Sequence, residues 1–156
     1  MESQVRMVGR LQAKVKRANS DKWEELWKKA IKNKIVNAGL ARMAYRVISD
    51  TGSPFKYGAI GTGSTAATAS DTALESQILT RNLAALTTDT TAVAGDTAKL
   101  VSTFTSDTNS YAVTEYASCE TASGGAILNR VTFGAITLDL NDVLQFTYTE
   151  QMQEGS

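Results

Sequence analysis

The sequence predicts a mainly β protein: an antiparallel β-sandwich or small barrel preceded by a basic arm and an amphipathic helical segment. Residues 1–50 carry 12 Lys and Arg against 5 Asp and Glu, whereas residues 51–156 carry 4 against 11. The neutral total therefore hides two oppositely charged segments. All 20 Thr residues lie from Thr51 onward, and high Thr content suits pleated, half-exposed strands.

Residues 1–19 are basic and only weakly apolar, and they are expected to form an arm that becomes ordered on contact with a partner. Gly9 and the short length make an isolated helix marginal. The apolar residues nevertheless recur at helical spacing: Val5, Val8, Leu11 and Val15.

Residues 20–52 predict an amphipathic helical segment. Asn19, Ser20 and Asp21 form a helix start signal, with Glu24 and Glu25 in the first turn. Apolar residues then follow at steps of three and four, which places them on one helix face. They are Trp23, Leu26, Trp27, Ala30, Ile31 and Ile35, followed by Leu40, Met43, Ala44, Val47 and Ile48.

Residues 53–150 predict the β domain, and residues 151–156 a flexible tail. Period-two runs occur at 111–116, 127–133 and 144–149, and a further strand is expected at 55–60. Gly124-Gly125 and Asn141-Asp142 supply turns between them. Short strands separated by turns are typical of sandwiches and small barrels.

The composition excludes several classes of protein. A chain of 156 residues fits one domain with an arm. No apolar stretch is long enough to cross a bilayer, and the basic start lacks an apolar signal core, so cytoplasmic synthesis is expected. Cys119 is the only cysteine, so no disulfide can form within the chain.

The sequence predicts no enzyme, and no cofactor or metal is expected. It contains no histidine, which removes the commonest general base and metal ligand. Gly61-Thr62-Gly63 lacks the Lys and the third glycine of nucleotide-binding loops and is interpreted as a turn. The acidic residues of the second segment are scattered through turns without calcium-loop spacing.

Glu115 is the one carboxylate in a strand-like run. An unpaired buried carboxylate is costly, so a buried Glu115 is expected to pair with Arg130 in a structural role. A solvated position on the strand is the alternative.

The basic segment supplies the candidate partner-binding residues. They are Arg6, Arg10, Lys14, Lys16, Arg17, Trp23 and Trp27. The neutral total argues against a dedicated nucleic-acid binder, although the arm has the residue types that contact phosphates. The two tryptophans with flanking lysines also suit a membrane surface, but packing on the β domain or another subunit is the preferred interpretation.

Several segments together resemble small structural proteins of tailed bacteriophages, described as minor virion, head-decoration or tail-fibre-type proteins. The resemblance covers residues ~35–150 and leaves the arm outside. It is carried by the following segments, in this order: IVNAGLA (35–41), PFKYGAIGTG (54–63), DTALE (71–75), AVTE (112–115), SGGAILNR (123–130), Phe133 and NDVLQFTY (141–148).

The resemblance implies a β-sandwich-like virion component without catalysis, made in the host bacterial cytoplasm. The leading expectation is a capsid decoration or cement protein whose basic arm and Trp23/Trp27 helix grip acidic surfaces of the major capsid protein or other virion subunits. A tail, collar or fibre component that forms a homo-oligomer, most simply a trimer, is the alternative. A host-surface binding module that uses loop 61–70 is a third class.

Overall fold

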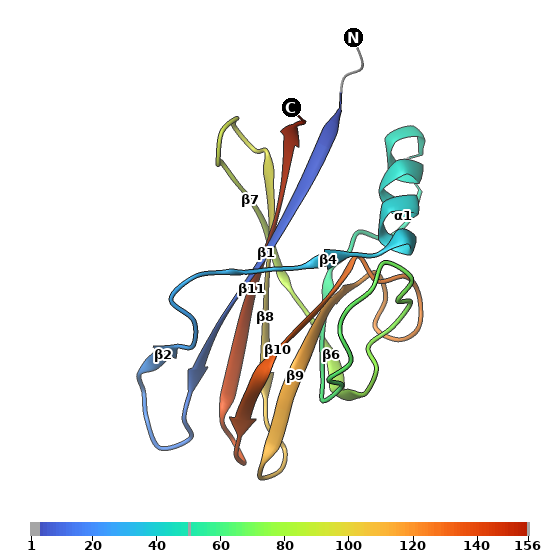
Figure 1. Cartoon of the computed structure of the whole chain (residues 1–156). Coiled ribbons are helices and arrows are strands. Elements are labelled where there is room, and N and C mark those ends of the chain that lie inside the picture. Colours follow the sequence, from blue (N-terminus) through green and yellow to red (C-terminus); the bar gives the residue numbers. More distant parts are fainter. Residues whose placement is uncertain (1–3, 50, 156) are drawn as a thin grey trace.

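The computed structural model describes residues 4–49 and 51–155, which form two antiparallel sheets and one short helix (Figure 1). The first sheet has the order β2-β1-β11-β8-β7, and β3 also pairs with β1. Its strands are β1 (Val5–Lys16), β2 (Trp23–Glu25), β3 (Ile31–Lys32), β7 (Ala85–Asp89), β8 (Thr97–Thr105) and β11 (Val143–Glu154).

The second sheet has the order β4-β10-β9-β5-β6. Its strands are β4 (Lys34–Ile35), β5 (Tyr57–Gly61), β6 (Gln77–Leu83), β9 (Tyr111–Cys119) and β10 (Asn129–Leu138). Helix α1 (Asn37–Ile48) follows β4. The sequence therefore predicted the mainly β, sandwich-like class correctly, and the described strands form two sheets rather than a closed barrel.

The core lies between the sheets and is rich in aromatic side chains. Tyr116 of β9 packs against Phe146 of β11 with ring centroids 4.9 Å apart, and Phe133 of β10 lies 5.6 Å from Phe146. Such tilted aromatic pairs add to the free energy of area burial. Aliphatic side chains from both sheets complete the core: Leu11, Val15, Ile60, Leu100, Val113, Val131, Ile136, Leu138 and Leu144.

The expectation of an arm is wrong for residues 5–16, which form the long strand β1, and residues 1–3 of the expected arm lie outside the described residues. This strand pairs along its whole length with β11, from Val5 opposite Glu154 to Lys16 opposite Val143. Leu11, Ala13 and Val15 alternate inward and are buried. The period-two pattern from Leu11 to Lys16 was the signal for this strand; Gly9 and Ala13, both small, weaken it.

The helix expected over residues 20–52 is correct only for Asn37–Ile48. Residues 20–36 instead form the short strands β2, β3 and β4, which carry the chain from the first sheet to the second. Most of the apolar residues at helical spacing in this stretch are partly buried against the core: Ile31 lies opposite Leu11, and Trp27 packs on Phe133, whereas Trp23 is exposed. The spacing of these apolar residues reflects which side chains pack on the core and does not report the local backbone conformation.

The flexible tail expected at residues 151–156 is also wrong for its first four residues. Strand β11 continues to Glu154, and the side chain of Gln151 is buried. The amide of Gly155 donates to the carbonyl of Gln4 (2.7 Å), which ties the two ends of the chain together. Figure 1 shows the start of β1 and the end of β11 side by side.

The expected turns are present and use backbone conformations that suit their residues. Gly124, Gly125 and Asn141 have φ of 60°, 68° and 66°, in the left-handed region that glycine and asparagine tolerate. The strands expected at 55–60, 111–116, 127–133 and 144–149 correspond to β5, β9, β10 and β11.

Candidate interaction surface

Four of the five basic residues singled out in residues 1–19 lie on one face of β1. Arg6, Arg10, Lys14 and Lys16 occupy even positions of the strand, and the odd positions 9–15 point into the core. At about 3.4 Å per residue, these four side chains span about 34 Å along the outward side of β1. We call this outward surface of the first sheet, with Lys32, the basic face.

Neighbouring strands extend the basic face sideways. Lys32 of β3 lies directly opposite Arg10, and Thr149 of β11 flanks Arg10 on the other side. Lys99 of β8 lies opposite Thr149, so the row runs from Lys32 to Lys99 across the sheet. Thr and Gln residues of β8 and β11 lie between the cations on this face: Thr103, Gln145, Thr147, Thr149 and Gln153.

Trp23 belongs to the basic face, because β2 pairs with the C-terminal part of β1. Its ring lies 4.7 Å from Lys14 Nζ and 5.6 Å from Lys16 Nζ. Contacts of this kind contribute about 0.5–1 kcal/mol at exposed sites. They also hold the two lysines close to the sheet, which gives the charges fixed positions.

The cations on β1 are largely uncompensated within the chain. Among the residues that the structure describes, Arg6, Arg10, Lys14 and Lys16 take part in no ion pair within 4.0 Å. Glu25 is the acidic neighbour on this face, opposite Lys14. Asp89 is engaged by Lys99 at 3.1 Å.

The structure does not bring Arg17 and Trp27 to the basic face. Arg17 donates to Asp142 Oδ2 and to the carbonyl of Thr137, both at 2.8 Å, and thereby anchors the end of β1 to the β10–β11 turn. Trp27 is partly buried against Phe133 and Phe146, with centroid distances of 5.2 and 6.3 Å. Both residues have structural contacts rather than a free surface.

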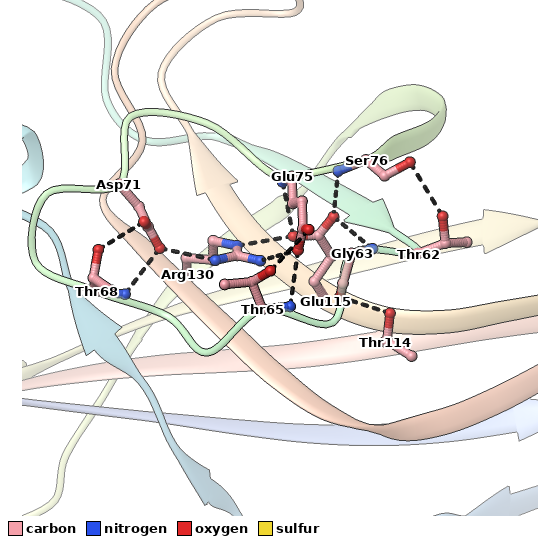
Figure 2. A network of polar contacts seen from close by, with 10 residues as sticks. All are labelled: Thr62, Gly63, Thr65, Thr68, Asp71, Glu75, Ser76, Thr114, Glu115 and Arg130. Atoms are coloured by element: carbon pink, nitrogen blue, oxygen red, sulfur yellow. Dashed lines mark hydrogen bonds and ion pairs between the residues drawn. The ribbon is translucent and has the colours of Figure 1, made fainter.

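Glu115 and Arg130 form the buried ion pair that the sequence suggested. Arg130 Nε donates to Glu115 Oε2 at 2.8 Å, and both side chains are almost fully buried (Figure 2). Arg130 also reaches Asp71 Oδ2 at 2.9 Å and Glu75 Oε2 at 3.4 Å. Burial alone would lower the pKa of Arg130, but hydrogen bonds and charge interactions with Asp71 and Glu115 outweigh it and raise the pKa.

The loop around Gly61-Thr62-Gly63 serves this carboxylate and not a nucleotide. The amides of Gly63 and Ser76 donate to Glu115 Oε1 at 3.0 and 2.8 Å, and the amide of Glu75 donates to Oε2 at 3.0 Å (Figure 2). A Cβ on Gly61 or Gly63 would collide with Glu115 Oε1. The two glycines are therefore needed to let the loop close over Glu115.

Burial raises the pKa of Cys119 to about 11, so this buried thiol stays protonated at neutral pH. Residues 4–49 and 51–155 contain no group of three or more potential metal ligands. Nor is any helix within these ranges long and apolar enough to span a membrane.

Sequence reasoning missed two features of this surface. One is Lys32, which falls within the helical segment expected at 20–52 but lies on the basic face opposite Arg10. The other is the edge of β1, because residues 5–9 were expected to belong to an arm and not to a strand. Comparisons of the chain with family models, curated proteins and solved structures gave no match.

Proposed function

We propose that the protein is a non-enzymatic structural component of a tailed-bacteriophage particle, a capsid decoration protein that docks through its basic face on acidic capsid surface. The observation that carries the proposal is the alignment of Arg6, Arg10, Lys14 and Lys16 on the outward face of one strand, where Arg6 and Arg10 are exposed and Lys14 and Lys16 are half-buried. The segment order that resembles phage structural proteins supplies the class of particle.

The geometry of the basic face suits a surface better than a small anion. Arg6, Arg10 and Lys14 follow one another at four-residue intervals, which is about 14 Å along a strand. A single phosphate or carboxylate cannot bridge such intervals. An acidic protein surface can, and complementary charge then sets the register and accelerates docking. Repetition over a symmetric shell adds avidity to individually weak contacts.

The test compares two triple variants with the same loss of charge. R10A/K14A/K16A removes cations of the basic face, whereas K22A/K28A/K29A removes exposed lysines that lie outside it. Purified phage heads lacking the protein are mixed with each variant, and bound protein is counted after sedimentation. The basic-face variant is expected to lose attachment at least roughly tenfold at 0.1 M salt, because each Debye-screened contact is worth on the order of 0.5 kcal/mol.

Wild-type attachment should also weaken steadily as salt is raised, since exposed charges are screened. Equal attachment of both triple variants, or attachment that ignores salt, contradicts docking through the basic face.

A tail, collar or fibre component is the second candidate, and one observation favours it. Val47 and Ile48 at the C-terminal end of α1 are 84% and 86% exposed, which suits contact with another subunit. A fibre protein would form a stable oligomer, most simply a trimer, in the absence of heads. Sedimentation equilibrium of the free protein separates the two candidates.

A further inference from the structure

The N-terminal part of β1 has a strand neighbour on one side only. β11 pairs with all of β1, but on the opposite side β3 covers only Arg10 and Leu11, and β2 only Lys14 to Lys16. Among the described residues, no strand covers Val5–Val8 on that side. Figure 1 shows this part of β1 projecting toward the N-terminus with β11 as its neighbour.

The backbone groups that face this open edge follow from the hydrogen bonds on either side. The carbonyls of Gly9 and Ala13 accept from Asn33 and Leu26, so odd residues of β1 turn their backbone groups away from β11. The carbonyl of Gln4, an even residue, faces Gly155 beside β11. The N–H and C=O groups of Val5 and Met7 therefore point to the open edge, and within the described part of the chain they have no backbone partner.

A cleft of about 440 Å³ runs beside this edge, a volume within the roughly 300–1,000 Å³ of ligand-binding clefts. One wall is β1 from Arg6 to Gly9. The other is the crossing segment from Lys32 to Ile35 with Leu40 of α1. A strand laid in the cleft would meet backbone donors and acceptors on one side and apolar surface from Met7 and Leu40 beside it.

The charge of the cleft selects the occupant. Arg6, Lys32 and Lys34 line it, and no carboxylate does so among the described residues. A second copy of this chain paired edge to edge would bring its own Arg6 and Arg10 against these cations, which is unfavourable. An acidic segment has the complementary charge.

We propose that the Val5–Val8 edge of β1 accepts an extended acidic segment of a partner protein as an added strand. Main-chain hydrogen bonds to Val5 and Met7 supply affinity, and the cations of the cleft select acidic side chains on the added strand. This inference goes beyond docking through the basic face, because it assigns a backbone site that does not depend on the phage assignment.

The test uses a blocked seven-residue peptide that alternates glutamate with valine and threonine (TEVEVET). Saturable binding is expected, with slowed amide hydrogen exchange at Val5 and Met7, and a lysine-substituted peptide (TKVKVKT) should not bind. A TEVEVET peptide N-methylated at alternate residues should also fail, because it keeps the charge but cannot form the ladder. This peptide separates strand addition from simple charge attraction.

M7P removes the outward amide without removing a ladder bond to β11, and proline is tolerated on edge strands. It should weaken binding about tenfold, whereas M7L should bind like the wild type. If M7P does not fold, V5P replaces it, because Val5 is 78% exposed and begins the strand.

Unchanged binding to the folded proline variant, or no protection of Val5 and Met7, overturns the proposal. Protection that appears without peptide and grows with protein concentration also overturns it, because the occupant is then a second copy.

Discussion

Two buried carboxylates in this molecule show opposite solutions to the same problem. Glu115 accepts four hydrogen bonds, three from amides and one from Arg130, so every lone pair that burial removes from water has a donor. Neither oxygen of the Glu115 carboxylate is therefore left without a hydrogen-bond donor. The pair also fixes the 62–76 loop against β9 and β10, which is a structural role.

Glu150 lacks this compensation. Its Oε2 accepts a hydrogen bond from the Tyr148 hydroxyl, but its Oε1 has no partner among the described residues. Burial raises the pKa of Glu150 to about 7, and the hydrogen bond from Tyr148 only partly offsets this. The neutral acid is therefore the form that the fold prefers.

The pKa of Glu150 predicts a stability that falls as pH rises. The folded state binds an extra proton between the ordinary pKa of 4.5 and about 7, so the favourable contribution is complete below 4.5 and lost as pH passes 7. E150Q stays neutral throughout. The unfolding free energy of E150Q minus that of the wild type should rise by on the order of 3 kcal/mol between pH 4.5 and 7.5.

Urea denaturation across that pH range measures the difference. E154Q, which changes an exposed carboxylate on the same strand, is the matched control. A flat difference for E150Q would mean that Glu150 is ionised in the folded protein.

At the residue scale the sequence indicated the ion pair but not the backbone amides that surround its carboxylate. Glu115 in a strand-like run, with Arg130 on another strand, was enough to suggest an ion pair. The amides of Gly63, Glu75 and Ser76 could not be anticipated, because they converge only when a loop folds back over the carboxylate. Glu150 lies on the inward face of β11 with Phe146 and Tyr148, and the lack of a partner for its Oε1 depends on tertiary contacts that the sequence does not reveal.

At the scale of elements, helix α1 is held by a charge clamp and a close backbone contact. Arg42 and Arg46, one turn apart, both reach the buried carboxylate of Glu120, at 2.9 and 3.4 Å. Arg46 also lies in the last turn, where a cation complements the helix dipole. Gly39 is buried in the first turn, and the main chain of Leu128 lies beside it.

The contact at Gly39 predicts that G39A destabilises the protein although alanine is the better helix former. The added Cβ would lie 2.8 Å from Leu128 Cα and 2.9 Å from its carbonyl carbon, and backbone atoms there cannot move aside easily. We expect a loss of about 1–3 kcal/mol in thermal or urea unfolding.

A44G is the control, because Ala44 is exposed on the same helix and its loss reflects propensity alone, about 1 kcal/mol. A G39A variant as stable as the wild type, or more so, would show that α1 is not docked on Leu128.

The elements that the sequence misassigned share one physical cause. From Trp23 to Ile35, apolar residues at steps of three and four predict a helix face, but the segment forms short strands. Its side chains that pack on the core are Leu26, Trp27, Ile31 and Ile35, whereas Trp23 lies on the basic face. The steps of three and four therefore arise from packing against the core and not from a helix. In β1 the true alternation was masked because its inward positions include Gly9 and Ala13, which carry little hydrophobic signal.

At the scale of the whole molecule, the basic and acidic segments of the chain are only partly separated in space. The basic segment does not hang free but contributes a strand beside β11, so the acidic C-terminal segment and the basic N-terminal segment share one sheet. Attraction between the two segments is compatible with this pairing, and the remaining cations of β1 face outward.

The pairing of β1 with β11 joins the two ends of the sequence, and this predicts how the chain responds to cutting and rejoining. Deleting residues 1–19 should abolish folding, because it removes a strand that buries Leu11 and Val15. A circular permutant that links residue 156 to residue 1 and opens the chain between Lys28 and Lys29 should fold, since both lysines are exposed and Gly155 already touches Gln4.

The permutant should also fold faster than the wild type. The β1–β11 pairing is among the most non-local in the natural chain and becomes a local hairpin after permutation, so the loop-closure entropy falls and the rate should rise roughly tenfold. Stopped-flow refolding measures the rate, and near-ultraviolet circular dichroism of all three proteins measures the packing of the core. A deletion variant with native aromatic packing would show that β1 is dispensable, as an arm would be, and that the sheet closes without it.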